Sequence, residues 1–177
     1  MIFRSHIDTA YETGIPHNYQ VYTTADVAFT GIDGQISYRV TPEARVTVFG
    51  DYVDTELKSE VFGYYDPDYA TDNLPRMSPA RLGARFDWAS GPVTADLEYY
   101  HTFMQDKVAV YETPTDGYGM LNATLAYSLD MNGWNELELY LRGSNLTNEL
   151  AFVHTSFVKD QSPLRGRNFV AGMRYLF

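Results

Sequence analysis

The stretch that decides the fold is Asn168-Phe169-Val170-Ala171-Gly172-Met173-Arg174-Tyr175-Leu176-Phe177, the last ten residues of the chain. Alternate side chains of a β-strand point to opposite faces. One face of this strand is therefore an apolar row with aromatic residues at its end, namely Phe169, Ala171, Met173, Tyr175 and Phe177. The other face carries Asn168, Gly172 and Arg174 together with Val170 and Leu176. A lipid-facing strand with an aromatic girdle has this pattern, whereas a soluble domain rarely ends on an exposed aromatic strand.

The composition narrows the class of protein further. The chain has 177 residues, enough for one domain, and no cysteine, so disulfides and thiol metal sites are excluded. A net charge of −10 argues against nucleic acid as a partner. No apolar run approaches the roughly 18–20 residues of a membrane helix. Abundant tyrosine and phenylalanine then favour an all-β protein.

Strand-like alternation recurs along the whole chain. In one segment Leu137, Leu139 and Leu141 alternate with charged or polar residues, as half-buried or lipid-facing strands do. We expect about eight antiparallel strands, over 2–12, 27–40, 45–57, 80–89, 93–110, 119–129, 135–146 and 168–177.

The predicted connections alternate in length. Residues 41–44, 90–92 and 130–133 contain the Pro, Gly and Asn of tight turns. The intervening links are longer, over 13–26, 58–79, 111–118 and 147–167. Short turns on one rim and long loops on the other are typical of an outer-membrane β-barrel.

The polar face of the predicted strands is highly charged. A small dry core would not hold so many charges, because buried charges must be paired. A wide lumen that is wet or filled with protein would, and the apolar row would then face lipid. These residues are Arg39, Arg81, Arg85, Asp87, Asp96, Glu98, Glu136, Glu138, Arg142 and Arg174.

Three motifs resemble the TonB-dependent outer-membrane receptors. Leu141-Arg142-Gly143-Ser144-Asn145-Leu146-Thr147-Asn148-Glu149 resembles the signature of their penultimate strand. Pro163-Leu164-Arg165-Gly166-Arg167-Asn168-Phe169 is similar to their approach to the final strand. Leu74-Pro75-Arg76-Met77-Ser78-Pro79-Ala80-Arg81-Leu82-Gly83 resembles an element that opens an earlier strand, and Phe177 matches the terminal aromatic residue of the family.

The resemblance implies a transmembrane barrel of 22 strands with an internal plug, of which residues 1–177 would be the C-terminal segment. No plug, TonB box or signal peptide is visible in the sequence, so we expect the plug domain and the N-terminal strands to be absent from it. The implied function is a receptor and active transporter for a scarce nutrient in the Gram-negative outer membrane. The implied partners are the TonB complex through the missing part, the barrel assembly machinery through Phe177, and outer-membrane lipid and lipopolysaccharide.

A finer resemblance points to the zinc-uptake branch of these receptors. This resemblance lies in the pattern of residue types over 99–109, 117–122 and 153–157 rather than in an identified set of metal ligands. Zinc or an iron chelate would be the transported substrate, and no resident cofactor is expected.

Candidate metal ligands follow from zinc's preference for His nitrogen and carboxylate oxygen. His154 and His17 lie in predicted long loops, and His6 lies on the polar row of the first segment. His101 shares the parity of the apolar row, which argues against ligation unless a bulge turns it. An acidic loop offers carboxylates suited to hard cations, although it lacks an EF-hand pattern; they are Asp66, Asp68 and Asp72. Ordinary loop histidines and a solvated acidic loop remain the alternatives.

Other functions remain open. A complete eight-stranded outer-membrane barrel with a structural or adhesion role requires residues 2–12 to pair with residues 168–177. A soluble β-barrel that binds an apolar ligand requires an apolar interior. An enzyme is not expected, because the sequence contains no nucleophile elbow and no phosphate-binding glycine loop; an outer-membrane esterase is the weakest alternative.

Overall fold

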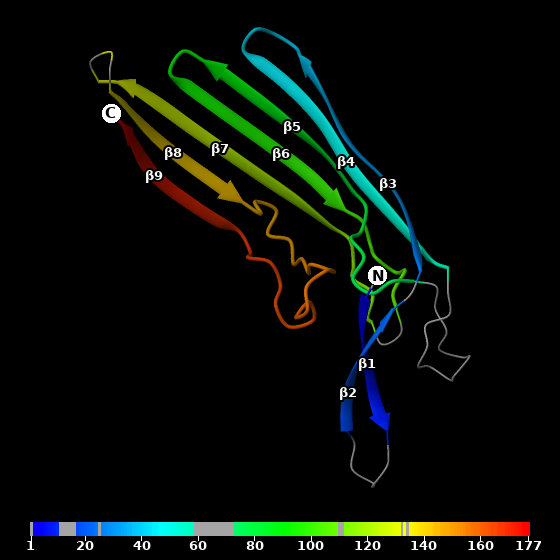
Figure 1. The fold of residues 1–177 in the computed structure, drawn as a ribbon. Coiled ribbons are helices and arrows are strands. Elements are labelled where there is room, and N and C mark those ends of the chain that lie inside the picture. The colour runs from blue at the N-terminus through cyan, green and yellow to red at the C-terminus, as the bar shows by residue number, and fades with distance from the viewer. Residues whose placement is uncertain are drawn as a thin grey trace.

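The chain folds into antiparallel β-strands (Figure 1). A computed structural model describes residues 2–10, 17–24, 26–58, 73–109, 112–131, 133 and 135–177, and for the first two strands it describes the backbone alone. The strands are β1 (Ile2–Ala10), β2 (His17–Thr24), β3 (Val27–Arg39), β4 (Ala44–Leu57), β5 (Arg81–Ser90), β6 (Val93–Thr102), β7 (Tyr118–Asp130), β8 (Glu136–Ser144) and β9 (Asn168–Leu176).

The predicted all-β antiparallel class is confirmed, with two differences in the strands. Residues 13–26 were predicted to be a link, but they contain β2, whose Tyr, Val and Thr residues favour a strand. The strand predicted over 93–110 ends at Thr102. Beyond it the chain bends away, and Gln105 forms an isolated antiparallel bridge with Thr115. No helix among the described residues is long and apolar enough to cross a membrane.

Seven strands form one sheet in the order β3-β4-β5-β6-β7-β8-β9, so every strand pairs with its neighbours in sequence. The short connections β3–β4, β5–β6 and β7–β8 lie at one end of the sheet, together with the C-terminus (Figure 1). We call this the turn end. The long connections 58–80, 103–117 and 145–167 begin at the opposite end of the sheet, where β4, β6 and β8 end, and we call this the loop end. The predicted separation of short turns from long loops is confirmed for these connections.

The pairing register collects the apolar side chains on one face of the sheet. Residues paired across antiparallel strands point to the same side. Tyr38 pairs with Val46, Val46 with Phe86 and Phe86 with Leu97, and the row continues across the remaining strands. Most side chains of this apolar face are solvent-exposed, including Ile36 at 80%.

The opposite, charged face contains the ten charged residues that the sequence placed together. Its side chains form ion pairs across strands, with Arg81 Nη2 2.8 Å from Asp51 Oδ1 and Arg174 Nη2 3.4 Å from Glu138 Oε1. At the turn end the same face contains a hollow of about 290 Å³ between charged residues, including Arg39 and Asp96. The structure thus confirms that two chemically different faces alternate along the strands of the seven-stranded sheet.

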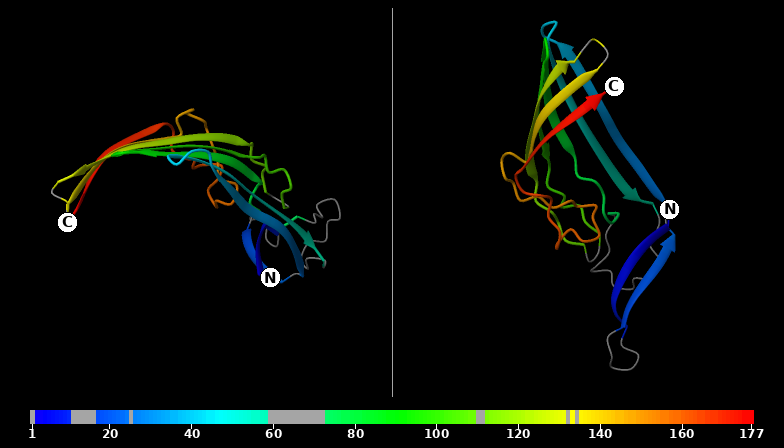
Figure 2. Two further views of the ribbon diagram at one scale, coloured as in Figure 1. Left: turned by 90° about the horizontal axis from the view of Figure 1, so that it is seen from above. Right: turned by 90° about the vertical axis from the view of Figure 1, so that its left-hand side faces the viewer.

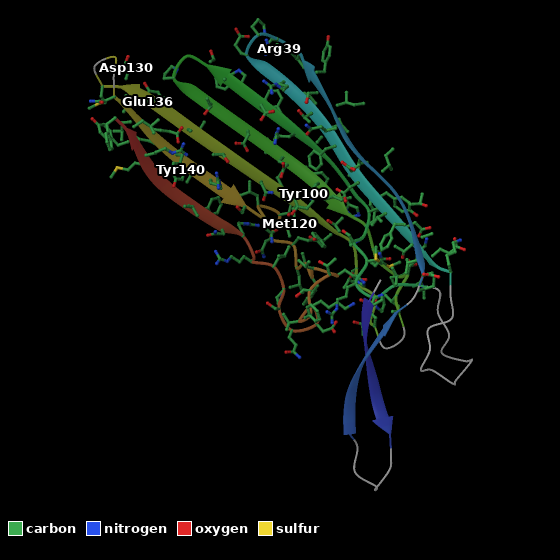
Figure 3. The ribbon with its side chains drawn as sticks, in the orientation of Figure 1. Arg39, Tyr100, Met120, Asp130, Glu136 and Tyr140 are labelled. Carbon is green, nitrogen blue, oxygen red and sulfur yellow. The ribbon has the colours of Figure 1, made fainter. Side chains whose placement is uncertain are left out.

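The sheet is curved rather than flat (Figure 2). Within the sheet, the buried residues other than glycine lie on the charged face. They are Thr47, Thr102, Met120 and Ala126. Figure 3 shows the two ends of this face, with Asp130 and Glu136 at the turn end and Tyr100 and Met120 at the loop end.

The described strands do not close into a barrel. β1 pairs with β2 in a separate two-stranded sheet, and β9 pairs with β8 alone. Among the described residues, the pairing of 2–12 with 168–177 that a complete eight-stranded barrel requires is therefore absent. The apolar interior of a soluble barrel is absent too, because the buried hydrophobic residues of the described part are only Leu74, Met120, Ala126 and Ala151.

We predict that Gly83→Ala lowers the free energy of unfolding by about 1–3 kcal/mol, the usual cost of overpacking. A Cβ at Gly83 would lie 2.4 Å from Phe49 Cζ and 2.8 Å from Tyr100 Cβ, so these two side chains would have to move. Gly34→Ala is the matched control, because a Cβ there meets nothing within 4 Å. Denaturant unfolding of both variants in detergent micelles measures the difference, and equal stabilities would contradict the packing.

Candidate functional site

The long connections pack against one another at the loop end. Leu74 is 1% exposed and contacts Val27, Leu57 and Met77, which gives the loops a small apolar centre. Backbone atoms of Gln105 and Thr115 exchange hydrogen bonds of 3.0 and 3.1 Å. At these positions the loops therefore make defined contacts with the strands and within themselves.

A buried polar cluster joins two of these loops. We call it the loop cluster and define it as Glu112, Thr115, His154 and Lys159. His154 is 2% exposed, and its Nδ1 lies 2.9 Å from Thr115 Oγ1. Its Nε2 lies 3.2 Å from Glu112 Oε1, although the N–H does not point squarely at that oxygen. The imidazole therefore connects loop 103–117 with loop 145–167.

Lys159 completes the loop cluster with a positive charge. Its ammonium group donates a hydrogen bond to the backbone oxygen of Thr113, and Nζ lies 3.5 Å from Glu112 Oε1 and 3.4 Å from His154 Nδ1. An ammonium group can only donate, so His154 Nδ1 is the acceptor in its contact with Lys159. Lys159 therefore lies between the carboxylate of Glu112 and the imidazole of His154, whose Nε2 has no hydrogen-bond partner among the described residues.

Glu112 is held as a carboxylate. Burial by itself raises the pKa of Glu112, but the contact with His154 and hydrogen bonds from the N–H groups of Ala109 and Arg76 lower it to about 2. The N–H of Arg76 donates to Oε1 over 2.9 Å, and that of Ala109 donates to Oε2 over 3.1 Å. Hydrogen bonds to the charged form of a carboxyl group outweigh its desolvation here.

Arg76 brings the third long loop to the loop cluster. Its φ of 58° turns the backbone so that its N–H reaches Glu112. Its guanidinium carbon lies 3.3 Å from the centroid of the Phe157 ring, a cation–π contact with loop 145–167. Contacts around Glu112 thus join the three long connections between β4 and β9.

Hydrogen bonds of asparagine side chains join the end of β8 to the segment that leads into β9. Asn145 is 3% exposed, with a φ of 50°. Its Nδ2 donates to the backbone oxygens of Glu149 and Arg165, and its Oδ1 accepts from the N–H of Glu149. Asn148 Oδ1 accepts from the N–H of Arg167 over 3.1 Å. The Asn-Leu-Thr-Asn motif therefore closes a loop by local hydrogen bonding.

The structure describes the side chain of one predicted metal ligand, His154. His154 lies in the loop cluster, where protein groups face both ring nitrogens and an ammonium group would repel a cation. His6 and His17 lie in β1 and β2, whose side chains are outside the described part. Asp66, Asp68 and Asp72 lie outside the described residues. Within the described residues no three His, Cys, Asp or Glu side chains gather as a metal site. Metal binding by these residues stays a prediction.

Sequence reasoning missed Glu112 and Lys159. Neither lies on an alternating strand or in a spacing motif, so no local pattern indicates them. His154 was singled out as a loop histidine, but its partner Thr115 is 39 residues away in the sequence. The remaining signal is weak: Lys and Glu are rarely buried unless they are paired, and burial itself is visible only in the fold.

The fold resembles part of a larger transport protein. No protein-family model matches the chain. A solved structure of the copper transporter OprC is similar, with a TM-score of 0.77 and 17% sequence identity. The likeness covers 98% of this chain and 27% of that chain, so this chain spans well under a third of that protein. At this identity the likeness shows the fold, which is that of a curved, antiparallel partial β-barrel.

We predict that the attachment between the loops weakens as the pH falls from about 4.5, the ordinary pKa of a glutamate, toward about 2. A lowered pKa in the folded protein stabilises it above the unfolded pKa, and that stabilisation, on the order of 2 kcal/mol, is lost as Glu112 is protonated. Amide NMR shifts of Thr115 and Lys159 followed from pH 6 to pH 2 measure the change.

Two variants complete this pH experiment. Glu112→Gln should abolish the pH dependence between pH 4.5 and 2, because an amide does not titrate in this range. Asp106→Asn removes an exposed carboxylate from the same loop and should leave the wild-type profile unchanged. An unaltered profile in Glu112→Gln would show that another group controls the attachment.

Proposed function

We propose that the chain forms part of the wall of an outer-membrane transport barrel that takes up a metal ion or a metal chelate. The observation that carries the proposal is the two-faced sheet, which is apolar and exposed on one side and charged on the other. The fold likeness to a copper transporter supports the transport role and the metal cargo.

The apolar face favours lipid as its surroundings. Transfer of a fully exposed Leu, Ile or Phe side chain from water to an apolar medium gains roughly 1.5–3 kcal/mol. A contiguous apolar patch of this extent is rare on a soluble monomer. Ile32, Leu125 and Met173, among many others, would occupy the hydrocarbon layer.

The connection lengths give the sheet a direction across the membrane. In outer-membrane barrels the short turns face the periplasm and the longer loops face the outside. The loop cluster and the Asn145 loop would then lie at the outer surface, and Phe177 would lie at the periplasmic rim. The charged face would line the lumen, where water and a plug domain can solvate or pair its charges.

The TonB-dependent receptors are the transport family that best accounts for the sequence motifs. Membership implies that uptake is driven by the TonB complex acting on a plug domain, and that the barrel assembly machinery reads the strand that ends at Phe177. The cargo stays a choice among zinc, copper and an iron chelate. The motif resemblance favours zinc, whereas the similarity to the copper transporter OprC favours copper.

We predict that Leu125→Arg disfavours folding into phosphatidylcholine vesicles by about 2–4 kcal/mol, the cost of an arginine on the lipid face near the midplane. Thr124→Arg is the matched control, because Thr124 is the next residue on the charged face, paired with Asp96 and Arg142. It should change the free energy by less than 1 kcal/mol. Equal effects of the two variants would contradict a lipid-facing assignment.

We predict that disrupting the gene lowers the cellular content of one metal among copper, zinc and iron when that metal is scarce. The reason is that outer-membrane transporters of this kind serve scarce nutrients. Mass spectrometry of whole cells measures all three metals together, and the same cells grown in metal-replete medium are the control. Unchanged contents of all three metals would contradict metal uptake as the function.

A further inference from the structure

Four charged residues lie side by side on the charged face at the turn end, in an unfavourable order. Arg39 pairs with Arg45, Arg45 with Asp87 and Asp87 with Asp96, so the row crosses β3, β4, β5 and β6. Figure 3 shows Arg39 at this end of the sheet. Like charges that lie directly opposite each other across strands destabilise a sheet. The row contains one such pair of arginines and one of aspartates, so it has a positive end and a negative end.

The two ends of the row do not neutralise each other. Arg45 and Asp87 are partners in the pairing register, yet they form no ion pair. Asp87 instead has Arg85 on its own strand, whose Nε lies 3.2 Å from Asp87 Oδ1. Arg39, Arg45 and Asp96 form no ion pair with any of the described residues. The folded chain therefore leaves three of the four charges uncompensated.

A hollow lies over this row. It has a volume of about 290 Å³, and all four charged residues line it. Thr94 and Thr124 line it as well and add hydroxyl groups. Glu43 borders it from the β3–β4 turn, where its carboxylate accepts a hydrogen bond of 3.0 Å from the Thr41 hydroxyl. Ligand pockets begin at about 300 Å³, so the hollow has room for a small molecule only.

The order of the charges specifies the kind of molecule. A simple anion would satisfy the arginines and be repelled by the aspartates, and a simple cation would do the reverse. A zwitterion satisfies both ends. Paired strands lie about 4.8 Å apart, so the centre of the arginine pair and the centre of the aspartate pair are roughly 10 Å apart. An extended peptide rises about 3.3–3.6 Å per residue, so the ammonium and carboxylate of a tripeptide are separated by a similar length.

We propose that the hollow binds a short zwitterionic peptide, about three residues long, across β3 to β6. The terminal carboxylate lies between Arg39 and Arg45, whose guanidinium groups offer paired donors in a matching geometry. The terminal ammonium lies between Asp87 and Asp96 and donates to their carboxylates. The site goes beyond the proposed transport of a metal, because it requires neither a metal nor a membrane.

The test titrates the full chain, folded in micelles of an uncharged detergent, with trialanine at low salt. The amide NMR shifts of Thr94 and Thr124, which line the hollow, measure binding at the site. Trialanine should produce shifts that saturate. Trialanine with an acetylated amine and an amidated carboxyl group has no charges, and it should produce none. Inorganic phosphate should bind about tenfold more weakly than trialanine or less, because it lacks the ammonium group.

A double variant tests the order of the charges. Arg39→Asp together with Asp96→Arg keeps the net charge but makes the signs alternate along the row, so that every charge has an opposite neighbour across the strands. It should weaken trialanine binding about tenfold or more and raise the midpoint of denaturation. Arg142→Gln is the matched control, because Arg142 is an exposed arginine of the same row outside the hollow, and it should bind as the wild type does.

Several results would overturn the proposal. They are no saturating shift with trialanine, equal binding of the blocked peptide or of phosphate, undiminished binding by the double variant, and a loss of binding in Arg142→Gln. If the double variant fails to fold, the comparison of ligands on the wild type still decides, because it needs no substitution. The vesicle experiment on Leu125→Arg is independent of this one, so a chain that folds in vesicles but binds no trialanine disproves the peptide site alone.

Discussion

The structure depends on keeping one pairing register across seven strands. Side chains alternate with a period of two, so a slip of one residue would move a whole strand's apolar row to the charged face. The row that begins with Tyr38 and Val46 stays on one side as far as Phe169 because each of the six pairings agrees with the next. Tight turns between β3 and β4 and between β5 and β6 leave little freedom for a different alignment.

At the loop end the stabilising interactions are of another kind. The loops have a small apolar centre at Leu74, so polar contacts carry much of the remaining attachment. Glu112 receives hydrogen bonds from two backbone N–H groups and has His154 and Lys159 close by, which compensates for its burial. Removing one partner from such a cluster leaves a buried charge unsatisfied, and this makes the loops depend on one another.

The sequence predicted the sheet well and the loops poorly, for a physical reason. The side of the sheet on which Leu137, Leu139 and Leu141 lie can be predicted from a few residues, because alternation is a local pattern. The strand β2 was missed because residues 13–26 were read as a link between two alternating segments. The loop cluster was missed because contacts such as that of Thr115 with His154 join distant parts of the chain, and no local pattern records them.

The hydrogen bonds of Asn145 and Asn148 change how the Asn-Leu-Thr-Asn motif is to be understood. Asn145 has a φ of 50°, and its side-chain amide donates to the backbone oxygens of both Glu149 and Arg165. Its role is therefore to fix the path of the chain between β8 and β9. These hydrogen bonds all join one part of this chain to another. The motif therefore records how the chain passes from β8 to β9, and a search for it would select chains that share this strand connection rather than chains that share a ligand.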